Sequence, residues 1–113
     1  MTQQTKTQTT QEMLEEHMES IAEGFQTAED AQNLFDDDGI LDIEYKVDRF
    51  GRLKAADVLI TSGGPNIWIE VDIDGRSTLE GSWGRGRYDA NLPVSFGRAL
   101  FDLIEQIGPV MNY

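Results

Sequence analysis

The sequence has 113 residues, of which 39% are hydrophobic and 9% aromatic, which suits one domain with a modest core and is too apolar for a disordered chain. It has no cysteine and one histidine, His17, which excludes disulfides, thiolate metal sites and a multi-histidine metal site within one chain. No apolar run is long enough to span a membrane, and the start, MTQQTKTQTTQ, lacks the apolar core of a secretion signal. We therefore expect a cytoplasmic protein without a metal or other cofactor.

The net charge of −12 comes from 21 acidic and nine basic residues and is concentrated in one segment. Between Glu12 and Asp48, 13 acids accompany a single base, Lys46, whereas the chain from Arg49 onward holds eight acids and seven bases. Acidity that served solubility alone would be spread along the chain. The acidic segment is therefore a candidate functional surface.

The N-terminal part predicts a tail and two helices. Residues 1–10 have no periodicity and are expected to form a disordered tail, followed by a single α+β domain over residues 11–113. Leu14, Met18, Ile21 and Phe25 recur at helical spacing, with glutamates on the opposite face. Gly24 is expected to end this helix. Thr27 and Asp30 resemble a capping box, which predicts a second short helix over 28–35.

The rest of the chain predicts four strands and a third helix. Two-residue alternation marks strands at 40–48, 54–62, 67–74 and 77–83, separated by the turn sequences DRFGRL, GGPN and DG. We interpret GRGRYDANLP as a loop and the apolar pattern from Val94 to Ile107 as a helix that Gly108 and Pro109 stop. The predicted fold is α+β, a four-stranded antiparallel β-meander covered by the N-terminal and C-terminal amphipathic helices.

The third predicted strand and the turn after it carry acids spaced almost like a calcium loop. Counted from Glu70, Gly75 is sixth as required, but the twelfth position is Gly81 rather than a glutamate, and both flanks are predicted strands. A β-hairpin with acids on its solvent face fits better. On the same polar face lies Trp68, which either marks a binding surface or is covered by a helix or loop. We expect His17 to be structural, and no nucleophile motif indicates an enzyme.

The acidic segment differs from an ordinary solvated face because its charges are of one sign. Solvated helices usually mix signs, since Glu–Lys pairs stabilise a helix and Glu–Glu pairs destabilise it. Carboxylates on one face of a strand are about 6.6 Å apart and can imitate the anionic backbone of DNA. The predicted partner-binding residues are these acids and Trp68: Glu12, Glu15, Glu16, Glu19, Glu23, Asp36, Asp37, Asp38, Asp42, Glu44, Asp48 and Trp68.

Residues 39–83 resemble a group of small acidic proteins of phages and mobile elements. The likeness lies in LDIEYKV, a glycine turn, GGPNIWIEVD and a strand that ends in tryptophan, and it covers less than half of the chain. It implies a mobile-element context, in which small acidic proteins are often antirestriction or anti-CRISPR factors that imitate DNA. It assigns no catalytic residue, and the sequence departs from the group at WGRGRYDANLP, where a more acidic stretch is expected.

These observations favour a non-enzymatic acidic inhibitor, encoded by a phage or mobile element, that binds a basic, nucleic-acid-binding host protein by DNA mimicry. We expect no direct contact with nucleic acid or membrane, and a monomer or homodimer. The alternative is a small protein-binding or assembly module that uses Trp68 and the sheet face. A third interpretation is a protein of a salt-loving organism, in which surface acidity maintains solubility; the clustering of the acids argues against it.

Overall fold

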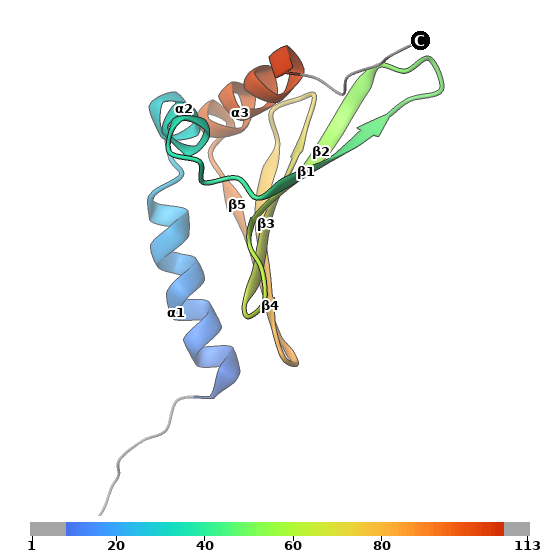
Figure 1. The fold of residues 1–113 in the computed structure, drawn as a ribbon. Coiled ribbons are helices and arrows are strands. Elements are labelled where there is room, and N and C mark those ends of the chain that lie inside the picture. Colours follow the sequence, from blue (N-terminus) through green and yellow to red (C-terminus); the bar gives the residue numbers. More distant parts are fainter. Residues whose placement is uncertain (1–8, 108–113) are drawn as a thin grey trace, which may run out of the picture.

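The computed structural model describes residues 9–107, which form three helices and a five-stranded sheet (Figure 1). The helices are α1 (Thr10–Glu23), α2 (Ala28–Asp36) and α3 (Val94–Ile107). The strands are β1 (Asp42–Val47), β2 (Leu53–Thr61), β3 (Asn66–Asp72), β4 (Ser77–Trp83) and β5 (Gly86–Leu92). The α+β class and the helix–helix–sheet–helix order predicted from the sequence are confirmed.

The sheet is an antiparallel meander in the order β1-β2-β3-β4-β5. The predicted number of four strands is wrong, because the segment interpreted as a loop forms β5. Trp83 pairs with Gly86, so that only Gly84 and Arg85 separate β4 from β5. A two-residue connection that begins with glycine is a common hairpin turn, and it lets the polar segment after it pair with β4 along its length.

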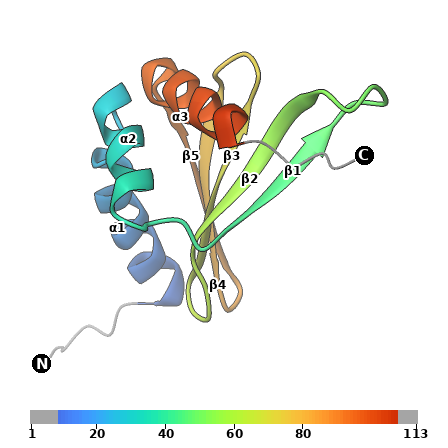
Figure 2. The same ribbon diagram turned by 45° about the horizontal axis from the view of Figure 1, so that its top comes forward.

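All three helices lie on one side of the sheet (Figure 2). α1 packs on β4 and β5, α3 packs on β2, β3 and β4, and α2 packs on α3. Leu14 and Met18 of α1 and Leu100 of α3 are fully buried against the sheet, as the helical spacing predicted. Phe25, just after α1, stacks on Phe96 of α3 with ring centroids 5.0 Å apart. The other face of the sheet, which we call the open face, has no helix over it (Figure 2).

Both N-terminal helices begin with a capping box. The Thr9 hydroxyl accepts a hydrogen bond from the Glu12 N–H, and the Glu12 carboxylate accepts one from the Thr9 N–H. Thr27 and Asp30 make the same reciprocal pair, as predicted, so α2 extends over Ala28–Asp36. The expected tail over residues 1–10 lies outside the described residues except at Thr9 and Thr10, which cap and begin α1 instead.

Candidate functional site

The open face carries carboxylates from all five strands. The antiparallel register aligns its side chains in two rows that cross the sheet. The first row, from β1 to β5, is Asp42, Leu59, Trp68, Glu80 and Asp89. The second row is Glu44, Asp57, Glu70, Thr78 and Asn91. With neighbouring strands about 4.8 Å apart, six carboxylates and one indole therefore share a narrow band of the sheet.

Trp68 lies at the centre of the first row, on the face away from the helices. Its cross-strand neighbours are Leu59 on β2 and Glu80 on β4, and it is half-buried among them. The interpretation in which a helix covers this tryptophan is therefore wrong: the helices pack on the opposite face of the sheet (Figure 2). An aromatic side chain at the centre of an acidic face supplies the apolar contact that many protein-binding surfaces contain.

Trp68 forms a wall of two shallow hollows. One hollow, of about 260 Å³, lies between the indole and β1 and is lined by Asp42, Glu44, Asp57, Leu59 and Trp68. The other, of about 320 Å³, lies toward β5 and is lined by Trp68, Glu80, Gly81, Arg87, Tyr88 and Asp89. In the second hollow the Arg87 guanidinium already donates to the carbonyl oxygens of Gly84 and Gly86.

Crowding of the carboxylates changes the proton affinity of Glu80. Burial, together with a hydrogen bond and charge repulsion from Glu70, raises the pKa of Glu80 to about 7, and the charges of Asp89 and Asp57 act in the same direction. At neutral pH a part of the molecules therefore carries a proton at Glu80. This proton relieves repulsion that the face would otherwise bear in the free protein.

One lysine partly neutralises the second row. Lys46 Nζ lies 3.3 Å from Asp57 Oδ2, and this contact raises the pKa of the Lys46 ammonium, with smaller effects from Glu70 and Glu44. The other oxygen of Asp57, Oδ1, is buried and has no hydrogen-bond partner among the described residues. A buried acceptor without a donor is uncommon and destabilising.

The glutamates of α1 continue the acidic surface around the β5 edge. Of the five predicted residues, Glu12, Glu16, Glu19 and Glu23 are exposed and Glu15 is half-buried. Glu12 also serves the capping box, and Glu15 accepts a hydrogen bond from the Gln11 amide. Burial raises the pKa of Tyr88 on β5, and so do the charges of Glu19, Glu15 and Asp89. Two α1 acids, Glu15 and Glu19, and the open-face acid Asp89 therefore approach one another around Tyr88.

Asp36, Asp37 and Asp38 lie at the C-terminal end of α2. Asp38 has the left-handed φ of 56°, and the Gly39 N–H donates to the Leu34 carbonyl, as in a Schellman motif. No basic residue occupies the last turn of α2, so these charges face the negative end of the helix dipole unrelieved by a cation within the helix. Their place is therefore electrostatically unfavourable for the isolated protein.

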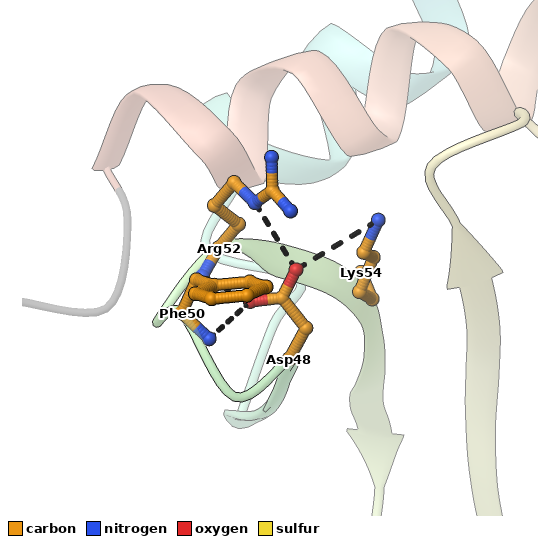
Figure 3. Close-up of polar contacts among 4 residues, drawn as sticks. All are labelled: Asp48, Phe50, Arg52 and Lys54. Carbon is orange, nitrogen blue, oxygen red and sulfur yellow. Dashed lines mark hydrogen bonds and ion pairs between the residues drawn. The ribbon is translucent and has the colours of Figure 1, made fainter.

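Asp48 holds the turn after β1 (Figure 3) and belongs to neither of the two carboxylate rows. Its Oδ1 accepts hydrogen bonds from the Phe50 and Arg52 N–H groups, and its Oδ2 lies 3.1 Å from Arg52 Nε and 3.9 Å from Lys54 Nζ. The hydrogen bonds from the Arg52 and Phe50 backbone, together with the Arg52 side chain, keep the pKa of Asp48 below its usual value. Phe50 is 69% exposed at the tip, with the Arg49 and Arg52 guanidinium groups each 5.2 Å from its ring centroid.

The near-calcium loop is a second copy of this turn, and the predicted hairpin is confirmed. Asp72 Oδ1 accepts from the Asp74 and Arg76 N–H groups, as Asp48 does from Phe50 and Arg52. Both turns follow the pattern Asp-x-x-Gly-Arg, and their glycines, Gly51 and Gly75, have φ of 80° and 86°, which glycine adopts without strain. The Asp72 carboxylate therefore stabilises the turn through hydrogen bonds to its backbone.

His17 lies on α1 and therefore away from the open face. It is exposed on α1 and lines a hollow of about 580 Å³ with Met13, Glu16, Ser20, Pro65 and Trp83. Within residues 9–107, no set of three or more His, Asp or Glu side chains is arranged to hold a metal ion. Over the same range, no helix has the length and apolar character needed to cross a bilayer.

The structure brings together only part of the predicted site. Asp42, Glu44 and Trp68 share the open face, and the α1 glutamates adjoin it, whereas Asp36–Asp38 and Asp48 lie at a helix end and in a turn. Four open-face acids were not among the predicted site residues: Asp57, Glu70, Glu80 and Asp89. Alternation within each strand, combined with the register of the short hairpins, is the signal that places them beside Trp68.

Comparisons with known proteins leave this site without a precedent to draw on. No protein-family model matches the chain, and searches of curated proteins and of solved structures give no significant match. The resemblance to small acidic mobile-element proteins therefore stays a prediction from the sequence.

Proposed function

We propose that this protein is a non-enzymatic acidic inhibitor of the anti-CRISPR or antirestriction kind, which occupies the DNA-binding groove of a nucleic-acid-handling protein. The observation that carries the proposal is the open face, where carboxylates from all five strands surround Trp68. Glu15 and Glu19 of α1 lie near Tyr88 on β5, as Asp89 of the open face does, and extend this surface around the β5 edge.

The spacing of the carboxylates suits a groove built for DNA. Successive open-face residues of one strand are about 6.6 Å apart and neighbouring strands about 4.8 Å apart. A DNA strand carries one charge per about 3.4 Å of helix axis, so a grid of fixed carboxylates offers a comparable density of anionic groups. Such a surface attracts basic grooves over long range and accelerates association at low salt.

The electrostatic cost of these charges also supports a binding role. Burial and the neighbouring carboxylates raise the pKa of Glu80 to about 7, and three aspartates face the negative end of the α2 dipole. Acids that served solubility alone could be spaced apart or mixed with lysines. A basic partner would relieve both costs on binding.

A second candidate function is a protein-binding or assembly module that uses Trp68 and the sheet face. The position of Trp68 at the centre of the open face favours it. The two candidates share a surface and differ in one respect, which is whether DNA competes with the partner.

DNA-cleavage assays test the proposal directly. Purified protein would be added to a CRISPR effector nuclease and to a type I restriction enzyme, and the rate of DNA cleavage would be measured at low and physiological salt. We expect inhibition of at least one enzyme that excess DNA relieves and that weakens as salt rises. Partner binding that neither DNA nor salt affects would favour the assembly module.

Two charge-matched variants locate the surface. Asp42→Asn, Glu44→Gln and Asp89→Asn together remove three charges from the open face, and Glu15→Gln, Glu16→Gln and Glu19→Gln remove three from α1. We expect both triple variants to inhibit less and to depend less on salt, with the larger loss on the open face. If the α1 variant inhibits as well as the native protein at both salt concentrations, the surface is confined to the sheet.

A further inference from the structure

We propose that the hollow between Trp68 and β1 binds an arginine side chain of the partner, with the guanidinium stacked on the indole and paired with the carboxylates of Asp42 and Glu44. This inference rests on the proposed function and names the chemical group that the site recognises. The occupant is an arginine presented by a basic protein.

The lining of the hollow favours a cation that also has an apolar surface. Three of its five lining side chains are carboxylates, Asp42, Glu44 and Asp57, and the other two are Leu59 and Trp68. Within residues 9–107, Lys46 is the one cation that forms an ion pair with any of these three carboxylates, and its partner is Asp57. Asp42 and Glu44 are exposed at the mouth of the hollow and have no ion pair among the described residues.

Arginine fits this lining better than lysine does. A guanidinium is planar and weakly hydrated, so it can stack on an indole and donate paired hydrogen bonds to a carboxylate at the same time. Lysine offers a compact, strongly hydrated charge that forms one of these contacts at a time. The indole also attracts the cation through its ring quadrupole.

The opposite hollow provides an internal comparison. It shares the Trp68 wall and holds Glu80 and Asp89, but Arg87 of the protein itself lies at its edge. The Arg87 guanidinium donates to two carbonyl oxygens, so the hollow toward β5 already contains a cation of the protein itself. In the hollow toward β1, no described cation forms an ion pair with Asp42 or Glu44. The β1 side is therefore the more anionic hollow.

Binding of hexa-arginine and hexa-lysine peptides tests the proposal. Affinities would be measured by isothermal titration calorimetry on the full chain at physiological salt. We expect hexa-arginine to bind about two- to fivefold more tightly than hexa-lysine, since a cation–π contact at an exposed site contributes about 0.5–1 kcal/mol. Equal affinities for the two peptides would overturn the proposal.

Variants of the hollow separate stacking from charge. Trp68→Leu should abolish the preference for arginine, whereas Trp68→Phe, which keeps an aromatic face, should retain part of it. The double variant Asp42→Asn, Glu44→Gln should lower the affinity for both peptides, and the matched change Glu16→Gln, Glu19→Gln on α1 should lower it less. An arginine preference that persists in Trp68→Leu, or equal losses from the two double variants, would contradict the assignment.

These results are independent of the cleavage assay. An arginine preference that depends on Trp68, found together with uninhibited nucleases, would reject the proposed inhibitor and keep the arginine site. If the protein inhibits a nuclease but binds hexa-arginine and hexa-lysine equally, the arginine site is rejected and the proposed inhibitor is kept.

Discussion

The side-chain amide of Gln11 forms two hydrogen bonds with the backbone of Arg87. Gln11 Nε2 donates to the Arg87 carbonyl oxygen over 2.8 Å, and the Arg87 N–H donates to Gln11 Oε1 over 2.9 Å. β5 is the last strand of the sheet, so its outer backbone groups have no further strand to pair with. Gln11 takes the place of that strand at one position and fixes the start of α1 to the sheet.

Replacing Gln11 by alanine should destabilise the protein by about 1 kcal/mol. Each hydrogen bond contributes roughly 0.5–1.5 kcal/mol net, and the better helix propensity of alanine offsets a part of the loss. Urea unfolding followed by circular dichroism measures the difference. Gln32→Ala on α2 is the matched control, because the side-chain amide of Gln32 donates to Asp36 within its own helix. Equal losses in the two variants would show that the Arg87 contact contributes nothing.

Leu100 tests the packing of α3 on the sheet. It is fully buried with Ile69 and Val71 in the same core, and Leu103 packs against that core. Leu100→Ala should cost about 2–5 kcal/mol, because it removes apolar contacts and leaves a cavity. Ile107 at the end of α3 is 53% exposed, so Ile107→Ala should cost under about 0.5 kcal/mol. A similarly small loss for Leu100→Ala would be incompatible with helix-on-sheet packing.

The helices could be predicted from the sequence because their signals are local. Leu14 and Met18 follow the helical period, and Thr27 with Asp30 forms the predicted capping box. β5 could not be predicted in the same way. Gly86, Asp89, Ala90 and Asn91 are weak strand formers, and the strand is stabilised by pairing with β4 and by Gln11, which lies 76 residues from Arg87 in the sequence.

The site was predicted only in part because charge density along the chain differs from charge density in space. Asp42 and Glu44 belong to the acidic segment, but the residues directly beside Trp68 are Leu59 of β2 and Glu80 of β4, which lie outside that segment. Glu80 and Asp89 are single acids in sequences of mixed charge, and only the strand register brings them together. Conversely, Asp48 lies in the acidic segment, but its carboxylate accepts hydrogen bonds from the backbone of its own turn.

Asp38 offers a test of local strain at the end of α2. Its φ of 56° is left-handed, and its charge faces the negative end of the helix dipole. Asp38→Gly removes both penalties and should stabilise the protein by about 0.5–1 kcal/mol, after allowance for the greater freedom of glycine in the unfolded chain. Asp38→Asn removes the charge alone and should give a smaller gain. Thermal melting measures both, and a loss of stability in Asp38→Gly would contradict the αL assignment.

The raised pKa of Glu80 makes stability depend on pH in a direction opposite to that of a salt-bridged acid. Its value of about 7 in the folded protein exceeds the ordinary value of 4.5, so the folded state binds more protons than the unfolded state between these limits. Stability therefore falls as pH rises from 5 to 8. The groups that face Glu80 are Glu70, Asp57, Asp89 and, at the edge of the hollow, Arg87.

Glu80→Gln should remove this dependence. The amide cannot ionise, yet it can still donate a hydrogen bond to Glu70, so the variant should match the native protein at pH 5 and exceed its stability at pH 8. The difference at pH 8 should be on the order of 1 kcal/mol, because solvent screening reduces the effect at a partly exposed site. Thermal melting of both proteins at the two pH values measures it, and titrating groups that do not interact with Glu80 cancel in the comparison. Glu105→Gln, at an exposed position of α3, is the control that should leave the pH profile unchanged. Parallel profiles for Glu80→Gln and the native protein would show that the open-face carboxylates do not share a proton. The crowding of these charges would then carry no electrostatic cost that a basic partner could relieve.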